Sequence, residues 1–291
     1  MGHTDSHRAS AWGLVPALML IAVFFAAYAI FIYASFTQSS GGTSVQGTGV
    51  SLANYIKYFS STSDLAILGE TLWISVWIML ASALLGYPVA YAIVRTQSLL
   101  LRNVLFIAVI MTFLSGSITR AYSWLVILGN RGLVNTLLLK IGFLTKPLQL
   151  VYNEIGVFVA LLHFVLPFFI LTMMGPLKNV HKNLEDSAIN LGASRAQTFV
   201  AVTLPLSLPG IVAGCSLTFA LSLSAFAFPL VLGGGRMRMV ANSIYENIFT
   251  AFNIPYAATI ATVFLVVALI SVWLFSALQR FAQSSRNIGG A

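Results

Sequence analysis

Long apolar runs alternate with short polar connections along the chain. Asp, Glu, Lys and Arg are absent between the following charged pairs: Arg8 and Lys57, Glu70 and Arg95, Arg102 and Arg120, Glu154 and Lys178, Arg195 and Arg236, and Glu246 and Arg280. About 20 apolar residues cross the hydrocarbon core of a bilayer as a helix. The pattern therefore predicts six membrane-spanning helices, near residues 14–36, 71–94, 103–121, 155–177, 206–231 and 257–279.

The connections between these runs predict additional short helices. Residues 37–66 are rich in Ser, Gly and Thr, and "LANYIKYF" within them indicates a short interfacial helix. After a turn at residues 130–132, Leu133, Leu137 and Lys140 recur at helical spacing. This favours a half-length amphipathic helix over a seventh span. "GGGRMRM" indicates a flexible link, and "VANSIYENIFTAF" indicates a short helix before the last span.

Composition supports an all-α integral membrane protein. Of the 291 residues, 58% are hydrophobic and 8% are charged, whereas a soluble domain has about 25% charged residues. The net charge of +8 does not indicate nucleic-acid binding, because no basic cluster is interleaved with exposed aromatic residues. The single cysteine, Cys215, falls within the fifth predicted span and cannot form an intrachain disulfide.

Charge along the chain favours one topology without deciding it. With the N-terminus in the cytoplasm, eight Lys and Arg residues fall on the cytoplasmic side and seven on the opposite side. The positive-inside rule therefore leans toward this topology but does not settle it. In that topology the tails at 1–13 and 281–291 would lie in the cytoplasm, and segment 14–64 would hold the first span and an extracytoplasmic loop.

The polar stretch "NLEDSAINLGASRAQTFVAVTLPLSLPG" separates the fourth and fifth predicted spans. Asn183 can cap a helix, with Glu185 and Asp186 in its first turn, where carboxylates are favoured. One apolar stripe recurs at i, i+4 and i+7 and consists of Leu184, Ala188 and Leu191. Gly192 follows directly and is the residue expected at a left-handed helix stop.

A second short helix is predicted after this stop. Ser194 and Gln197 form an S-x-x-Q capping box, and the apolar side of the helix is expected to contain Phe199 and Val202. Pro205 disfavours helical geometry at Leu204 and is expected to end the helix there. A passive loop needs neither a stripe nor a capping box. The segment 181–205 is therefore interpreted as a surface hairpin that docks into a partner's groove.

"DSAINLGASRAQTFVAVTLP" resembles the cytoplasmic EAA loop of type I ABC importer permeases, whose pattern is E-A-A-x3-G-x9-I-x-L-P. Asp186, Ser187 and Ala188 occupy the E-A-A places, Gly192 the glycine, Val202 the isoleucine, and Leu204 and Pro205 the closing pair. Asp replaces Glu, Ser replaces the first Ala, and Glu185 lies one residue earlier. The sequence leaves open which carboxylate, Glu185 or Asp186, makes the expected polar contact.

Two further stretches, "ITRAYSWLVILGNRGLVNTLL" and "NIPYAATIATVFLVV", are similar to polyamine-type permeases, a branch that includes importers of opines and related small solutes. The resemblance covers residues 65–280. It implies six transmembrane helices with a cytoplasmic coupling hairpin, in a multi-pass protein of the bacterial inner membrane with both termini in the cytoplasm.

The same resemblance implies the partners. An ABC ATPase homodimer would dock on the hairpin, a second, non-identical permease subunit would complete the path, and an extracytoplasmic binding protein would deliver the solute. ATP and Mg would belong to the ATPase, because this chain has no G-x-x-x-x-G-K-[ST] motif. The chain itself is expected to be no enzyme and to hold no cofactor or metal. The expected ATPase-coupling residues are Leu184, Glu185, Asp186, Ser187, Ala188, Leu191, Gly192, Val202, Leu204 and Pro205.

Polar residues within or near spans are candidates for the solute path, because an unpaired charge in lipid is costly. The candidates are Arg120, Tyr122, Trp124, Ser222, Ser224, Phe226 and Phe228. For Arg120, snorkelling to the interface is an equally good interpretation, and His163 is expected to bond a neighbouring helix. The charge of the solute is left open: Glu70, Glu154 and Glu246 suit a cation, whereas Arg120, Arg131, Arg236 and Arg238 suit an anion or zwitterion.

Two other functions compete with the importer. An ion-coupled secondary transporter is expected to show carboxylates or other ion ligands at the membrane midplane and inverted repeats, and no Asp or Glu falls inside a predicted span. A non-transporting membrane scaffold would need no capped surface hairpin.

Overall fold

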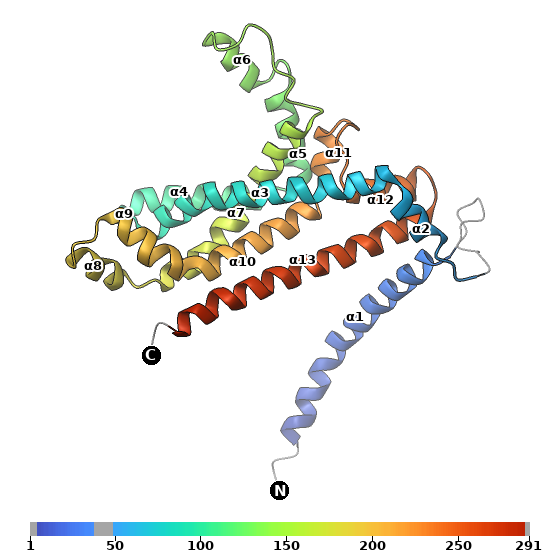
Figure 1. The fold of residues 1–291 in the computed structure, drawn as a ribbon, viewed down its shortest axis with the longest axis horizontal. Coiled ribbons are helices and arrows are strands. Elements are labelled where there is room, and N and C mark those ends of the chain that lie inside the picture. Colours follow the sequence, from blue (N-terminus) through green and yellow to red (C-terminus); the bar gives the residue numbers. More distant parts are fainter. Residues whose placement is uncertain (1–4, 38–48, 289–291) are drawn as a thin grey trace. The chain divides into compact units, whose positions relative to one another are not determined.

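Helices form nearly all of the regular structure (Figure 1). The computed structural model describes residues 5–37 and 49–288, with side chains for 16, 18–37 and 49–280. Within these residues the only β-type pairing is an isolated bridge between Thr37 and Val50. The predicted all-α class is confirmed.

The helices of the described segments follow one another with short connections. In chain order they are α1 (Asp5–Ser35), α2 (Ala53–Ser60), α3 (Thr62–Arg95), α4 (Leu99–Leu114), α5 (Ser117–Leu128), α6 (Leu133–Lys140), α7 (Glu154–Asn179), α8 (Lys182–Asn190), α9 (Arg195–Thr198), the π-helix η1 (Phe199–Thr203), α10 (Leu204–Leu223), α11 (Ala227–Leu232), α12 (Val240–Phe249) and α13 (Ile254–Ile288). The short helices predicted before the second span, after residue 132 and before the last span are α2, α6 and α12.

Five helical segments are long and apolar enough to cross a membrane within the described residues: Leu18–Ser35, Thr62–Arg95, Glu154–Asn179, Arg195–Leu223 and Ile254–Arg280. A sixth crossing is possible if the bent pair Leu99–Leu114 and Ser117–Lys140 counts as one span. Each predicted span thus has a helical counterpart. Several helices are longer than predicted: α1 begins within the predicted tail 1–13, and α13 continues into the predicted tail 281–291.

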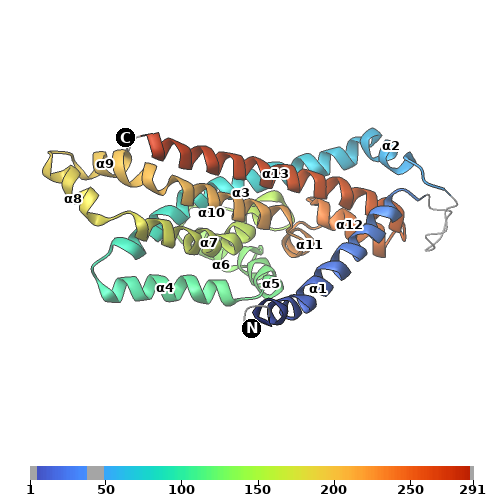
Figure 2. The same cartoon turned by 90° about the horizontal axis from the view of Figure 1, so that it is seen from below.

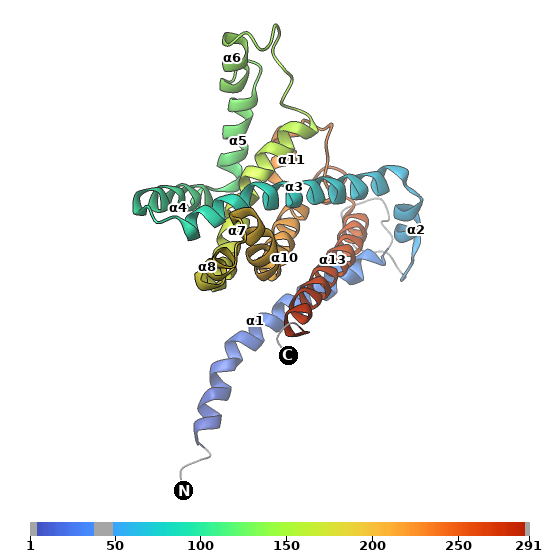
Figure 3. The same ribbon diagram turned by 60° about the vertical axis from the view of Figure 1, so that its left-hand side comes forward.

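The third predicted span, 103–121, is not one helix. α4 ends at Leu114, α5 begins at Ser117, and the two directions differ by 105°. Figure 3 shows α5 and α6 leaving α4 steeply. Ser115 and Gly116 both adopt extended backbone angles at the break. Glycine is among the residues least favourable for a helix, so the break falls at a locally weak point.

The fifth predicted span, 206–231, is also interrupted. α10 ends at Leu223, and a separate short helix, α11, begins at Ala227. Pro229 lies in the first turn of α11 and has no N–H with which to continue a helical ladder from the preceding turn. The chain between the two helices is therefore free to turn, and it exposes Ser224.

The contacts of the chain divide it into two compact units. One unit consists of Met1–Leu65 and Ser243–Phe264, and the other of Ala66–Asn242 and Leu265–Ala291. The first unit thus combines the N-terminal part of the chain with a segment that lies far from it in the sequence.

Polar contacts connect the pieces of the N-terminal unit. The Tyr256 hydroxyl donates to the Asp64 carboxylate at 2.6 Å, and the Lys57 ammonium lies 4.4 Å from the centre of the Tyr256 ring. Thr259 donates to the Ser35 carbonyl at 3.1 Å. These contacts join the end of α1, α2 and the beginnings of α3 and α13.

Close helix packing characterises the larger unit, where α7 and α10 run alongside each other (Figure 2). The fully buried Phe169 of α7 lies between glycines of two other helices. A Cβ atom added at Gly86 of α3 would lie 2.7 Å from the ring, and one added at Gly214 of α10 would lie 2.9 Å from it. Small residues allow membrane helices to approach closely in this way. These helices hold the hairpin and the cavities described below.

Candidate functional site

The predicted hairpin is present at the end of α7. Its first helix, α8, has His181 at the N-cap, and this residue makes no side-chain capping bond. The prediction that Asn183 caps the helix is wrong, because Asn183 lies inside the first turn and its carbonyl accepts from the Ser187 hydroxyl at 2.7 Å. The helix begins earlier than expected because Val180 and His181 are extended.

The turn between the two hairpin helices is the predicted one. Gly192 has φ +95°, and the Ala193 N–H bonds the Ala188 carbonyl at 3.1 Å, closing the end of α8. Ser194 then caps α9: its hydroxyl accepts from the Gln197 N–H at 3.2 Å, and the Gln197 side chain accepts from the Ser194 N–H at 2.8 Å. The left-handed stop and the capping box are both confirmed.

Pro205 does not end the second helix, contrary to prediction. Leu204 has helical angles, φ −64° and ψ −49°, and its N–H bonds the Phe199 carbonyl in a π turn. α9, η1 and α10 therefore form one helical run, Arg195–Leu223. A π turn is wider than an α turn, and here it directly precedes the residue that has no N–H. The hairpin is thus directly continuous with a spanning helix.

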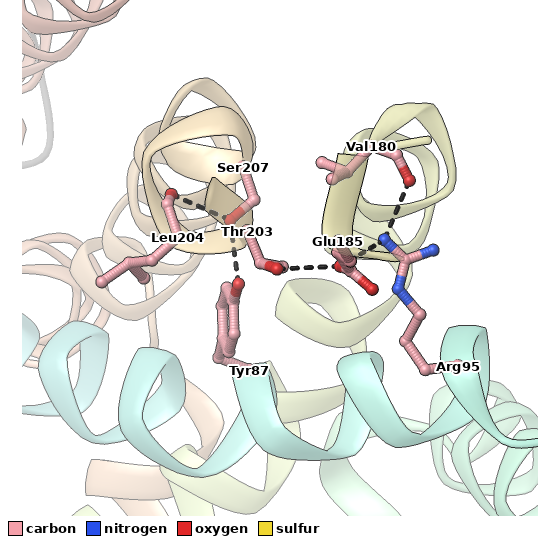
Figure 4. Close-up of polar contacts among 7 residues, drawn as sticks. All are labelled: Tyr87, Arg95, Val180, Glu185, Thr203, Leu204 and Ser207. Carbon is pink, nitrogen blue, oxygen red and sulfur yellow. Dashed lines mark hydrogen bonds and ion pairs between the residues drawn. The ribbon is translucent and has the colours of Figure 1, made fainter. Parts of the chain in front are cut away.

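Glu185 turns inward, toward α3 and the start of α10 (Figure 4). Its Oε1 atom accepts from Arg95 Nη2 and from the Thr203 hydroxyl, each at 2.8 Å. The same Arg95 nitrogen donates to the Val180 carbonyl at 2.8 Å. Glu185 is only 8% exposed, whereas Asp186 is exposed. Of the two carboxylates, Glu185 therefore makes the internal contact and Asp186 is available to a partner.

A second set of contacts joins the π turn to α3. The hydroxyl groups of Tyr87 and Ser207 are 2.9 Å apart, and Ser207 also donates to the Leu204 carbonyl at 3.1 Å (Figure 4). The Phe199 ring packs edge-on against Tyr87 and Tyr91, with ring centres 5.7 Å apart in both pairs. Phe199, predicted on the apolar side of the second helix, therefore packs against α3.

The other expected coupling residues lie on the outside of the hairpin. Leu184 is 48% exposed and Leu191, at the tip, is 90% exposed. Ser187, Gly192 and Pro205 are also exposed, whereas Ala188, Val202 and Leu204 are half-buried. The predicted apolar stripe is therefore accessible over α8 and the turn.

A cavity of about 430 Å³ lies between α5, α7 and the interrupted region after α10. Several predicted path residues line it, namely Tyr122, Ser224, Phe226 and Phe228. Ile118 and Phe164 also line it and were missed, because nothing in their local sequence separates them from core residues. The break after Leu223 brings Ser224 and Phe226 to the cavity wall.

Arg120, Trp124 and Ser222 are not among the residues that line this cavity. Arg120 is 4% exposed, so it neither snorkels nor lines this cavity. Its guanidinium donates to the carbonyls of Thr112, of Ser115 at 2.9 Å and of Phe164 at 3.4 Å. It therefore supplies donors to the two carbonyls at the end of α4, Thr112 and Ser115, and joins that end to α7.

Trp124 and Ser222 make structural contacts as well. The Trp124 indole N–H donates to His163 Nδ1 at 3.2 Å, which confirms that His163 bonds a neighbouring helix. Ser222 is fully buried, and its hydroxyl donates to the Thr218 carbonyl at 2.8 Å within α10.

Several known proteins are similar to this chain in sequence. The family model described as "Binding-protein-dependent transport system inner membrane component" matches residues 74–283. The spermidine/putrescine transport system permease protein PotB of Haemophilus influenzae is 28% identical over 248 residues, covering 85% of this chain and 82% of the relative. The inner membrane ABC transporter permease protein YdcU of Escherichia coli is 32% identical over 225 residues, covering 74% and 71%.

Solved structures show the same fold. A chain of a bacterial ABC transporter that imports alginate superposes with a TM-score of 0.81 at 17% identity, covering 95% of this chain and 96% of that chain. A chain of the MetNI methionine ABC transporter superposes with a TM-score of 0.57 at 15% identity, covering 76% and 99%.

Proposed function

The chain belongs to the family of binding-protein-dependent transport system inner membrane components and is a permease subunit of a type I ABC importer. We propose that its hairpin at 181–205 transmits the force of a partner ATPase to the spanning helices. The observation that carries this proposal is the inward ion pair between Glu185 and Arg95. It fastens the hairpin to α3, while the unbroken helical run through η1 fastens it to α10.

Because of these two connections, a displacement of the hairpin would also displace α3 and α10. A force on its exposed tip at Leu191 reaches α10 through continuous helix and reaches the end of α3 through Glu185. Packed helices respond to such forces by small rigid shifts. Helix α10 leads to the break after Leu223, so its shift would move the wall of the 430 Å³ cavity.

The ATPase surface is formed by the exposed side of α8 and by the turn. Leu184 and Leu191 supply the apolar contact, and Asp186 supplies an outward carboxylate. An amphipathic helix that lies in a partner's groove has this character. We expect the partner to be an ATPase homodimer that holds ATP and Mg; this chain carries no phosphate-binding glycine motif of its own.

The remaining partners follow from binding-protein-dependent transport. One similar structure is a complex with an alginate-bound periplasmic protein. For this chain we expect an extracytoplasmic binding protein and a second, non-identical permease subunit that completes the path. The hairpin and both termini face the cytoplasm. The relatives named for spermidine and putrescine indicate a small solute, polyamine- or opine-like.

Purification of the tagged chain from its native membrane in mild detergent tests the proposal. An ATPase and a second permease should accompany it, and the complex should hydrolyse ATP. Leu191→Asp should release the ATPase and retain the second permease. Leu100→Asp is the matched control, because Leu100 is 76% exposed in the first turn of α4, outside the hairpin.

Full retention of the ATPase by Leu191→Asp would show that the hairpin tip is not the docking surface. Purification of the chain without any ATPase, together with proton- or sodium-driven uptake, would replace the importer by a secondary transporter.

A further inference from the structure

A second cavity lies between the beginnings of α3 and α7. Its volume is about 280 Å³, and its lining includes Glu70, Trp73 and Trp77 from α3 with Glu154 and Phe158 from α7. The walls are mostly apolar. The fold therefore brings two carboxylates that are far apart in sequence to one aromatic cavity.

The cavity is on the opposite side of the membrane from the hairpin. Glu70 precedes Arg95 by 25 residues (95 − 70) on the same helix, α3, and Arg95 contacts the hairpin. At about 1.5 Å per residue this separation is roughly 37 Å, which exceeds the hydrocarbon thickness of about 30 Å. In the proposed orientation the cavity faces the side from which a binding protein delivers solute.

The charges in the cavity are of one sign. Among the residues whose side chains the structure describes, neither Glu70 nor Glu154 forms an ion pair with a Lys or Arg. Arg236 and Arg238 flank the lining residue Met237 in sequence, but neither lines the cavity. Arg120 is engaged by backbone carbonyls elsewhere. Glu70 and Glu154 are both exposed, so their carboxylates are accessible to a cation that enters the cavity.

The aromatic residues suit the same ligand. The indole rings of Trp73 and Trp77 are nearly perpendicular, with an interplanar angle of 80° and centres 5.6 Å apart. Trp73 is 64% exposed and Trp77 is 48% exposed, so both rings are accessible. The face of an indole attracts an ammonium group, and tryptophan does so more strongly than the other aromatic residues.

We propose that Glu70, Glu154, Trp73 and Trp77 bind an alkylammonium group of the solute as it enters the path. The carboxylates form charge-assisted hydrogen bonds to the ammonium, and the indoles cover its alkyl chain. This inference rests on the proposed function and adds the sign of the solute's charge: the solute is a cationic amine. An anionic solute would meet two like charges here.

Tryptophan and glutamate at span ends also serve as simple interfacial residues, so the test measures binding directly. The intact complex, in lipid nanodiscs and without binding protein, is titrated with radiolabelled putrescine. Unlabelled n-butylamine, n-butanol and succinate compete in turn. We expect n-butylamine to displace the label, and n-butanol and succinate to have no effect.

The double variant Glu70→Gln/Glu154→Gln should weaken putrescine binding by about tenfold or more, because each removes a charged hydrogen-bond partner. Trp73→Leu and Trp77→Leu should each weaken it by about threefold to tenfold, and the corresponding Phe variants by less. Glu246→Gln is the control, because it removes an acidic residue of α12 that does not line the cavity.

The two proposals fail in different ways. If the complex contains an ATPase whose activity depends on Leu191 but the double variant binds putrescine like the wild type, the cation site is wrong and the importer stands. Displacement by succinate, or an equal loss in Glu246→Gln, also overturns the cation site. Absence of any ATPase from the purified complex contradicts the proposed function itself.

Discussion

Arg95 Nη2 and Glu185 Oε1 lie 2.8 Å apart although the two residues are separated by 90 positions in the chain. Their side chains are 17% and 11% exposed. The same Glu185 oxygen accepts from Thr203, which ends the π turn. One carboxylate thus holds together the end of α3, the first hairpin helix and the entry to α10.

Glu185→Gln is expected to weaken the hairpin's attachment. It removes the charge that pairs with Arg95, and a hydrogen bond involving a charged group contributes about 1.5–3 kcal/mol. The hairpin should become more sensitive to limited proteolysis, and ATP hydrolysis by the purified complex should continue with reduced solute transport per ATP.

Asp186→Asn is the matched control for Glu185→Gln, because it neutralises the neighbouring, exposed carboxylate. It should leave the protease pattern unchanged and lower the amount of bound ATPase. If the two variants behave alike in both measurements, the separation of an internal and an external carboxylate is wrong.

Gly192 should be replaceable only at a conformational cost. Its φ of +95° is unfavourable for residues with a side chain, at of order 1–3 kcal/mol. An added Cβ would meet no atom within 4 Å. Any loss of stability of the turn in Gly192→Ala therefore comes from the backbone conformation alone. We expect reduced ATPase retention in the purified complex.

Gly192→Asn should lose less bound ATPase than Gly192→Ala, because asparagine enters left-handed conformations more readily. Gly192→Trp should lose the most bound ATPase, since it adds bulk beside the docking surface. Retention of ATPase in the order Trp, Ala, Asn from highest to lowest would contradict this account.

The hairpin was largely predictable because its signals are local. The Gly192 stop and the Ser194–Gln197 capping box each depend on residues within one turn of helix. The partner of Glu185 was not predictable, because Arg95 lies on another helix and no sequence spacing relates the two. The continuity through Pro205 was missed because a π turn leaves no mark in the hydrophobic pattern.

The broken spans show the same limit. Uncharged runs located the five candidate spans of the described residues and the bent helix pair, but the pattern from 103 to 121 is apolar on both sides of Ser115 and Gly116. The break is tolerated because Arg120 bonds the freed carbonyls, and that contact forms only after the chain has turned. Arg120 was therefore predicted in the solute path although it holds the break.

Arg120→Met should destabilise the protein rather than alter solute recognition. Without the guanidinium, the carbonyls of Thr112 and Ser115 at the end of α4 lose a charged donor, and a hydrogen bond to a charged group contributes about 1.5–3 kcal/mol. The thermal midpoint for loss of monodisperse protein in detergent should fall. The thermal midpoint of Arg120→Lys should fall less, since one ammonium group replaces part of the donor set.

Tyr122→Phe serves as the comparison for Arg120, because Tyr122 is 56% exposed and lines the cavity. Its thermal midpoint should match the wild type. An Arg120→Met protein with unchanged thermal stability and abolished uptake would return Arg120 to the solute path.

Ser224→Leu should obstruct the solute path. Ser224 is exposed and lines the 430 Å³ cavity beside Phe226 and Phe228, and the larger side chain projects into that space. We expect solute uptake to fall by about tenfold or more, equivalent to about 1.4 kcal/mol, while ATP hydrolysis and ATPase retention persist.

Ser222→Ala is the control, because Ser222 is fully buried and bonds within α10. It should support normal uptake. Normal uptake by Ser224→Leu, measured as initial rates in whole cells at equal protein levels, would place the path elsewhere in the complex.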